Sequence, residues 1–344
     1  MGRNVLVTGV SRGLAAQHAR VLALHPDVTK VVGVDVVPPR QGIDGVKFIR
    51  ADIRSPVVGK VLAVEDVDTV VHLAVAPSST AGSRTSTKES NVVGSMQLLA
   101  ACQHSATVRK LVLKSSTSVY GASPRDPAMF SEGMGPTRSP RSGFAKDCVE
   151  VEGYVRGFAR RRPDVHVTNL RLANVLSPVW DTPMSSYLRL PVLPTVLGFD
   201  PRLQVVHPED VLESLLRAVV HDVPGTFNVA GPGVLVLSQV LRRLGRLAVP
   251  VPAFTLSRGG STILAALRAN VPGDLVQLLM HGRGVDITAL TEVFGHRPRH
   301  TSAATVDAFL LGLPPGSVAD SRVRAAQARL TEDRSHREKV DSHG

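Results

Sequence analysis

Two glycines and an aspartate near the N-terminus have a spacing that suits phosphate and ribose binding. Gly9 directly follows the β-rich run at residues 4–8, and Gly13 stands where a helical pattern begins. Glycines in a strand-to-helix turn let backbone amides approach a pyrophosphate, and the helix N-terminus adds partial positive charge. Asp35 ends the next apolar run, about 20 residues later, where an acid accepts both ribose hydroxyls and repels a 2′-phosphate. The spacing therefore predicts a dinucleotide site that favours NAD over NADP.

The glycine turn is incomplete, so other interpretations stay open. Arg12, Ala15 and Ala16 fill positions where glycine often stands, although alanine is tolerated at the last of these, where close helix packing is the requirement. Arg12 could close on the pyrophosphate as a cation, or its side chain could point outward. Asp35 could simply cap its strand, and Arg40, five residues later, weakly favours a 2′-phosphate.

The elements that would hold these residues alternate through the first 230 residues. Short β-rich runs are separated by helical patterns at residues 14–24, 90–103 and 143–158. The runs lie at residues 4–8, 30–35, 47–49, 69–73, 110–115, 165–172 and 226–229. Such alternation predicts an α/β fold, a doubly wound parallel sheet of the Rossmann type with helices on both faces.

The pattern changes after Ala230, where glycines and prolines interrupt the alternation of strands and helices. Two more helical stretches follow, near residues 237–244 and 261–268. We expect an NAD-binding domain over residues 1–230, with an excursion into the substrate lobe near 176–204. Residues 231–313 are expected to form a small C-terminal substrate lobe, and residues 314–344 a polar, loosely ordered tail.

Composition argues against several classes of protein. The chain has 344 residues, of which 43% are hydrophobic, and no apolar run reaches the roughly 18 residues of a membrane span. An apolar run begins directly after the N-terminus, so no signal peptide is expected. Two cysteines, Cys102 and Cys148, argue against a disulfide framework and fit a reducing cytoplasm. The net charge of +11 comes mostly from scattered arginines, and with 4% aromatic residues nucleic-acid binding is not expected.

Six short motifs follow one another along the first 230 residues. They are Ala51-Asp-Ile53, Val70-Val-His-Leu-Ala-Val75, Asn91-Val-Val-Gly-Ser95, Ser115-Ser-Thr-Ser-Val-Tyr-Gly121, Leu170-Arg-Leu-Ala-Asn-Val175 and Val206-His-Pro-Glu-Asp-Val211. Together they resemble the NAD-dependent epimerase/dehydratase family of the extended short-chain dehydrogenase/reductase superfamily, most of all its UDP-glucose 4-epimerase-like members. The resemblance implies NAD as cofactor, a nucleotide-sugar substrate that reacts through a transient hydride transfer, and a homodimer formed by the helices at residues 90–103 and 143–158.

The resemblance also implies site residues. Ser116 would hydrogen-bond the reacting oxygen, and Asn174 would contact the phosphates of the nucleotide sugar. Arg202 is displaced by one residue from the family's arginine, which puts recognition of a UDP diphosphate in doubt. His207 is interpreted as a structural residue, and no metal site is expected. The residues expected to line the NAD site are Gly9, Ser11, Arg12, Gly13, Leu14, Asp35, Asp52, Ile53, Leu73, Ala74, Val75, Asn91 and Ser115.

The catalytic pair of the family is missing. In the family, a Tyr-x-x-x-Lys pair shares one helix face, where the tyrosine moves a proton and the lysine binds the nicotinamide ribose. Phe144 and Cys148 occupy these two positions, and Glu152 follows Cys148 by four residues, as a family glutamate follows the lysine. Phenylalanine has no titratable proton. Cys148 could become a thiolate near a positive nicotinamide ring, but a small buried apolar residue is the favoured interpretation.

Other side chains could in principle replace the pair, and none is favoured. They are Lys114, Tyr120, Lys146, Asp147 and Tyr154.

Two hypotheses about function follow. The first is an epimerase or dehydratase relative that works through an unusual acid–base arrangement. The second is a non-catalytic NAD-binding sensor, subunit or scaffold. Dehydrogenation of a hydroxysteroid-like substrate would need the same missing pair and is not favoured.

Overall fold

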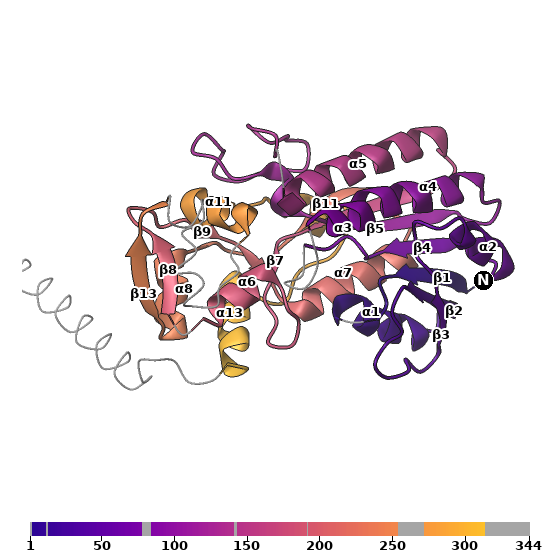
Figure 1. Ribbon diagram of the computed structural model, residues 1–344, viewed down its shortest axis with the longest axis horizontal. Helices are drawn as coiled ribbons and strands as arrows, with labels where there is room; N and C mark the ends of the chain where they lie inside the picture. The colour runs from indigo at the N-terminus through magenta and orange to yellow at the C-terminus, as the bar shows by residue number, and fades with distance from the viewer. Residues whose placement is uncertain are drawn as a thin grey trace, which may run out of the picture.

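A parallel sheet forms the centre of the molecule (Figure 1). The computed structural model describes residues 2–11, 13–77, 84–140, 143–190, 192–253 and 272–313. Seven strands pair in the order β11-β6-β5-β4-β1-β2-β3, and the order reverses between β1 and β4. They are β1 (Arg3–Thr8), β2 (Val28–Asp35), β3 (Val46–Arg50), β4 (Thr69–His72), β5 (Lys110–Ser116), β6 (His166–Leu172) and β11 (Gly225–Val229). This is the doubly wound parallel sheet predicted from the alternating runs.

The strands form where the sequence is continuously apolar and β-branched. Val5, Leu6 and Val7 of β1 are fully buried, and all of β4 is buried. Strands covered on both faces read as such runs, because neither face meets water. Each buried valine or leucine contributes about 1.5–3 kcal/mol relative to an exposed one, so these runs fix which segments enter the sheet.

Helices cover both faces of the sheet. On one face α1 (Gly13–Ala23) packs against α7 (Pro208–Val220). On the other face α4 (Gly94–His104) packs against α2 (Val57–Val64) and α5 (Gly143–Arg161), as Figure 1 shows. Three short helical segments border the site: α3 (Arg84–Lys88), the π-helix η1 (Glu89–Val93) and the 3₁₀-helix η2 (Thr117–Tyr120).

A smaller lobe with its own apolar core follows at the other end of the molecule (Figure 1). Leu193, Leu237, Leu279 and Phe309 lie in this second core. The elements of the lobe and its connections are β7 (Asn174–Val175), α6 (Pro183–Leu188), β8 (Val192–Val196), β9 (Arg202–Leu203), β10 (Val205–Val206), β12 (Leu235–Val236), α8 (Leu237–Leu244), β13 (Leu247–Val251), α11 (Gly273–His281), α12 (Thr288–Glu292) and α13 (Ser302–Leu311).

The chain crosses between the two cores more than once. Val285, Leu290 and Phe294 pack into the first core, although they follow α11 of the smaller lobe. The predicted helix near residues 261–268 and the predicted tail at residues 314–344 lie outside the described residues.

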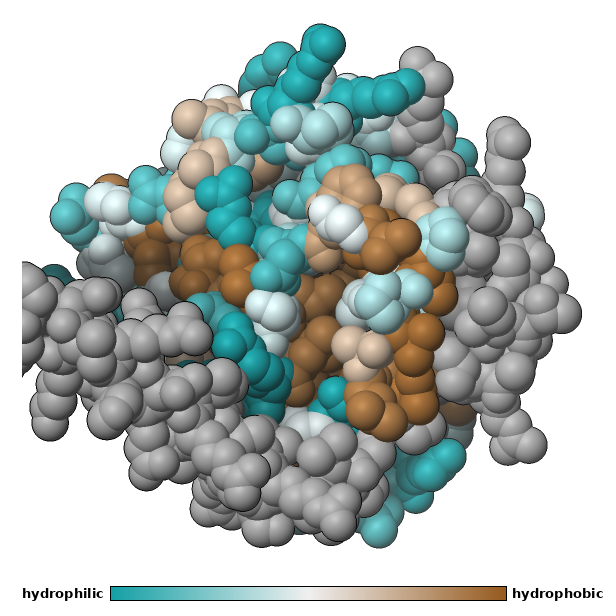
Figure 2. Space-filling view, turned by 90° about the vertical axis from the view of Figure 1, so that its left-hand side faces the viewer, coloured by the Kyte–Doolittle hydropathy of each residue, from teal (hydrophilic) through white to brown (hydrophobic). Residues whose placement is uncertain are grey.

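The end of the smaller lobe is apolar at its surface (Figure 2). Leu197, Phe199, Leu247 and Val249, in and beside the paired strands β8 and β13, are exposed. Within the described part of the chain, no helix is both long and apolar enough to span a membrane.

Candidate cofactor and substrate site

The turn after β1 keeps an open space at the N-terminus of α1. Gly9 has φ +76°, and a Cβ atom added there would lie 3.0 Å from Cα of Ala74. The turn therefore lies directly against the backbone that follows β4. Gly13 has φ +61° with nothing within 4 Å of an added Cβ, and no acidic residue stands in the first turn of α1. Open backbone at a helix N-terminus suits a pyrophosphate. Arg12 lies outside the described residues.

Asp35 joins the end of β2 to the glycine turn. Its Oδ2 accepts a hydrogen bond from the amide of Ser11 at 3.0 Å, and its Oδ1 accepts one from the amide of Val36 at 2.7 Å. A carboxylate offers about four lone-pair sites, so acceptors remain for a ribose diol. Asp35 thus caps its strand and still fits NAD.

A buried hydrogen-bond network joins β1, β4 and α4 beneath the turn. The hydroxyl of Thr8 accepts from the amide of Leu73 at 3.1 Å and donates to Nδ1 of His72 at 2.8 Å. Nε2 of His72 then donates to Oγ of Ser95 at 2.7 Å, and Ser95 donates to the carbonyl of Asn91. Burial lowers the pKa of His72 to about 3, so the ring stays neutral and carries one proton. Because Ser95 uses its own proton for Asn91, the ring proton lies on Nε2.

Asn91 fastens the segment that follows β4. Its Nδ2 donates to the carbonyl of Ala76 at 2.8 Å and to Oδ2 of Asp147 at 3.0 Å, and its Oδ1 accepts from the amide of Ala76 at 3.1 Å. Asn91 is buried within the π-helix η1, a helix type that often occurs at functional sites. Its side chain therefore acts on the predicted cofactor site through residues 73–76.

The other predicted cofactor residues lie in α1 and in the segments that follow β3 and β4. Leu73 and Val75 are buried, while Leu14 and Ala74 are partly buried against the main core. Ile53 packs on Gly94, where an added Cβ would lie 2.7 Å from Cδ1 of Ile53.

Asp52 pairs with Arg54 at 2.6 Å, and the hydrogen bonds of Arg54 lower the pKa of Asp52.

A buried ion pair fixes the register of α5. Both carboxylate oxygens of Glu152 accept hydrogen bonds from Arg171 of β6, at 3.0 and 2.7 Å. Ser115 of β5 donates to Oε1 of Glu152 at 2.6 Å, so it faces α5. With Glu152 anchored, Phe144 and Cys148 lie two turns and one turn earlier on the helix.

Neither residue at the pair positions is available for proton transfer. Phe144 is partly buried and packs against the main core. Cys148 is 1% exposed, and burial raises the pKa of its thiol well above the usual range. The thiol therefore stays protonated at neutral pH, which agrees with the apolar interpretation of this residue.

Four of the five candidate substitutes are engaged in the protein or lie on its surface. Asp147 is fully buried and bonds Asn91. Tyr120 is buried, its hydroxyl 2.8 Å from both Asn228 and Arg171, and burial raises its pKa. Lys146 pairs with Glu150 at 3.6 Å, and Tyr154 is exposed.

Lys114 differs from the other four. It is partly buried near the end of β5, and desolvation lowers its pKa to about 8. Ser116 lies two residues further along β5 and is also partly buried. Its Oγ accepts a hydrogen bond from the amide of Ser118 and donates one to the hydroxyl of Ser118, both at 3.1 Å.

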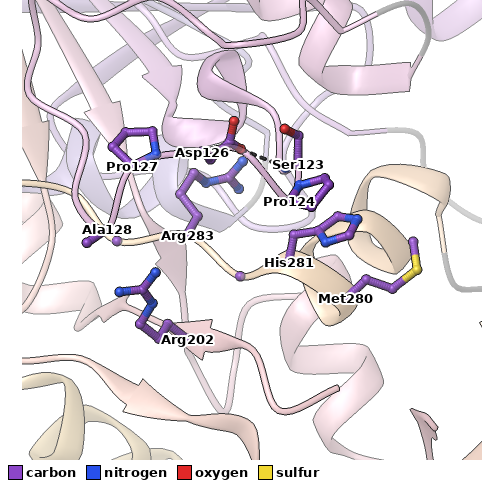
Figure 3. A pocket seen from close by; sticks show the side chains of 11 residues that line it. Ser123, Pro124, Asp126, Pro127, Ala128, Arg202, Met280, His281 and Arg283 are labelled. Atoms are coloured by element: carbon purple, nitrogen blue, oxygen red, sulfur yellow. Dashed lines mark hydrogen bonds between the residues drawn. The ribbon is translucent and has the colours of Figure 1, made fainter. Parts of the chain in front are cut away.

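A pocket of about 190 Å³ opens where the loop after β5 meets the smaller lobe (Figure 3). Arg202, His281 and Arg283 line it together with Asp126. Nη1 of Arg283 donates to the carbonyl of Gly121 at 2.6 Å. Figure 3 shows the guanidinium group of Arg283 beside Asp126 and that of Arg202 apart from it. Two guanidinium groups suit an anionic ligand.

Sequence reasoning missed His281 and Arg283. Their only sequence signal is a basic residue on either side of Gly282, far along the chain from Arg202.

Asn174, which was predicted to contact the substrate, and the nearby Gln204 and His207 have mainly structural contacts. Asn174 is partly exposed in β7, which pairs with β10. Gln204 is buried and bonds Gly231 and Val285. His207 caps α7 by accepting from the amide of Glu209 at 3.3 Å and stacks on His300 with ring centroids 3.8 Å apart. The structural interpretation of His207 is consistent with these contacts.

The reversal of strand order at β1 and β4, the glycine turn there and the acid ending β2 define a dinucleotide-binding Rossmann protein. The chain belongs to the NAD dependent epimerase/dehydratase family, whose model matches residues 5–230. This match confirms the family predicted from the six motifs. Because the family is NAD-dependent, it also confirms the predicted cofactor, and the turn and Asp35 fit that cofactor.

Relatives in sequence include an uncharacterized protein of Mycobacterium tuberculosis (strain ATCC 25618 / H37Rv). It is 41% identical over 331 residues, covering 94% of this chain and 88% of the relative. A trifunctional UDP-glucose 4,6-dehydratase/UDP-4-keto-6-deoxy-D-glucose 3,5-epimerase/UDP-4-keto-L-rhamnose-reductase of Arabidopsis thaliana is 28% identical over 138 residues. That match covers 36% of this chain and 20% of the relative.

Solved structures share the fold at low sequence identity. MoeE5 in complex with UDP-glucuronic acid and NAD has a TM-score of 0.69 and 22% identity, covering 90% of this chain and 98% of that chain. A tyrosine-to-phenylalanine mutant of UDP-glucuronic acid 4-epimerase from Bacillus cereus, in complex with UDP-4-deoxy-4-fluoro-glucuronic acid and NAD, has a TM-score of 0.69. It is 19% identical, with the same coverage of 90% and 98%.

Proposed function

We propose that the protein is an NAD-dependent enzyme that acts on a nucleotide sugar by epimerase or dehydratase-type chemistry. One observation carries the proposal: the pocket lined by Arg202 and Arg283 adjoins the end of β5 that carries Ser116. Arg283 of the pocket donates to Gly121 at 2.6 Å, and Gly121 follows η2, which begins directly after Ser116. A phosphate in the pocket would thus place an attached sugar near the end of β5.

The residues would divide the work as follows. Bound NAD supplies a hydride acceptor for a sugar carbon. Ser116, with a half-exposed hydroxyl, would hold the reacting sugar oxygen, and Asn174 would contact the phosphates. Arg202 and Arg283 would bind the diphosphate through charge-assisted hydrogen bonds, which are roughly twice as strong as neutral ones.

The Bacillus cereus mutant gives this proposal a precedent for binding. It holds both NAD and a UDP-sugar analogue although phenylalanine replaces one of its tyrosines. The proposal takes Phe144 to be equally compatible with binding of both ligands.

The test is calorimetric binding of NAD, followed by turnover of UDP-glucose, UDP-galactose and UDP-glucuronic acid. We expect saturable binding of NAD and at least one of these nucleotide sugars. We also expect an Arg283→Met variant to lose nucleotide-sugar affinity about tenfold while it keeps NAD affinity. If none of the three sugars binds or reacts when NAD is bound, the proposed function fails.

A second candidate, a non-catalytic NAD-binding protein, rests on the buried thiol of Cys148 and on Phe144. General acid–base help is worth about 10²–10⁴-fold in rate. Under this reading the wild type binds NAD without turnover, and only a Phe144→Tyr/Cys148→Lys double variant becomes active. Turnover by the wild type would exclude it.

A further inference from the structure

Strand β5 carries two lysines on one face, and their surroundings differ. Lys110 is fully buried, and its ammonium donates to the carbonyls of Val219 at 2.8 Å and His221 at 2.7 Å. It also pairs with Asp222 at 2.6 Å. The side chain of Lys114, four residues later, forms no hydrogen bond or ion pair with any residue in the part of the chain that the structure describes. The counter-group of Lys114 is therefore absent from the described protein.

Lys114 lies on β5, the strand that ends in Ser116. It stands on a central strand between β4 and β6, and its backbone pairs with that of Leu170. Two titratable groups feel its charge: His72 from β4 and Cys148 from α5. Burial keeps both neutral, since it lowers the pKa of His72 and raises that of Cys148. The ammonium thus lies near the strand end where the family's cofactor site is built, within electrostatic range of Cys148.

The contrast between the two lysines argues for a ligand. A lysine on a central strand needs partners, because an unpaired buried charge is strongly unfavourable. Lys110 has three partners, as a structural lysine should. Lys114 remains desolvated, and its partly buried side chain has no hydrogen-bond or ion-pair partner among the described residues. An anionic or hydroxyl-bearing molecule in the cleft would satisfy it.

We propose that Lys114 supplies from β5 the positive charge that the Cys148 position on α5 does not provide, and that it binds the cofactor at its nicotinamide-ribose end. The inference rests on the proposed function for the identity of the cleft. Lys114 is thus a cofactor-binding residue of this chain.

The experiment measures NAD and NADH affinity by calorimetry and NADH fluorescence. Wild type is compared with Lys114→Met, Lys114→Arg and the control Lys146→Met, which removes a surface lysine of α5. We expect Lys114→Met to bind about tenfold more weakly, Lys114→Arg to stay within about threefold of wild type, and the control to be unchanged.

The pH dependence gives a test that does not depend on how well a variant folds. The wild-type affinity should fall as pH rises from 7 to 9.5, because the ammonium loses its proton near a pKa of about 8. Lys114→Arg should show no such fall, since guanidinium stays charged above pH 12. At pH 8 wild type should take up as much as about half a proton when NAD binds, visible in buffers of different ionisation enthalpy.

A double variant tests the exchange of positions directly. Lys114→Ser/Cys148→Lys moves the lysine from β5 to α5 and should recover at least half of the affinity lost in Lys114→Met, on a logarithmic scale. Wild-type affinity in Lys114→Met, or a wild-type affinity that is flat across this pH range, overturns the proposal. Failure of wild type to bind NAD at any pH overturns both proposals. Lys114-dependent NAD binding without nucleotide-sugar binding supports this inference and sinks only the proposed function.

Discussion

Asn91 donates a hydrogen bond from Nδ2 to Oδ2 of Asp147 across 3.0 Å, and both side chains are buried. The bond joins the π-helix η1 to α5. The same amide also holds Ala76. The position of α5 and the shape of the loop after β4 are therefore coupled through one side chain.

Replacement of Asp147 by alanine should weaken both the fold and the cofactor site. We expect the free energy of unfolding to fall by about 1–3 kcal/mol, because Asn91 loses a buried partner. NAD affinity should also fall, since residues 73–76 lose support. Urea denaturation and calorimetry measure the two effects. A matched Glu150→Ala change on the exposed side of α5 should alter neither, and an Asp147→Ala variant with wild-type stability would contradict the prediction.

Lys114→Met should raise the stability of the ligand-free protein. The folded-state pKa of Lys114 is about 8, below its ordinary value of 10.5. Burying the charged ammonium therefore lowers the free energy of unfolding by its full amount below pH 8, and this loss fades as pH rises toward 10.5. We expect a gain of about 1 kcal/mol at pH 7, reduced from the full effect because the side chain is only partly buried. The gain should shrink above pH 8. Urea midpoints at pH 7 and pH 9.5 check this, and a loss of stability at pH 7 would show a structural role instead.

Gly9→Ala and Gly13→Ala form a matched pair in the glycine turn. Both positions have positive φ, but only at Gly9 would the new Cβ lie against backbone, 3.0 Å from Cα of Ala74. We expect each change to cost about 1 kcal/mol for the left-handed conformation, with a further loss at Gly9 from displacement of residue 74. NAD affinity should fall most in Gly9→Ala. Equal effects in thermal unfolding and NAD titration would argue against the close approach.

Asp274 of α11 should stabilise the start of α5. Its Oδ2 accepts a hydrogen bond from the amide of Ala145 at 3.0 Å, in the first turn of the helix. A carboxylate there satisfies an unpaired amide and complements the helix dipole. Asp274→Ala should lower the free energy of unfolding by about 1 kcal/mol, while Asp274→Asn should lose less. Chemical denaturation measures both losses. If Asp274→Asn loses as much stability as Asp274→Ala, the neutral acceptor of asparagine does not replace the carboxylate, and the prediction is contradicted.

Much of the fold was predictable because its signals are local. The seven β-rich runs all became strands of the central sheet, since a run of buried β-branched residues has few other stable places. The glycine turn and Asp35 were predictable for the same reason: each meets a steric or charge requirement within a few residues.

The finer site was not predictable because it depends on partners distant in sequence. Lys110 and Lys114 look alike in the sequence, and only the packing of α7 against β5 supplies partners to one of them. Arg283 reaches Gly121 from 162 residues away. Whether Asn91 faces a ligand or Asp147 depends on how η1 and α5 meet.

The anchoring of α5 through Glu152 and Arg171 has an evolutionary consequence. Because the ion pair and Ser115 hold the helix in register, residues 144 and 148 are relieved of that task. Side chains at these two positions can therefore change while α5 keeps its position in the fold. The fold of α5 therefore does not depend on which side chains stand at positions 144 and 148.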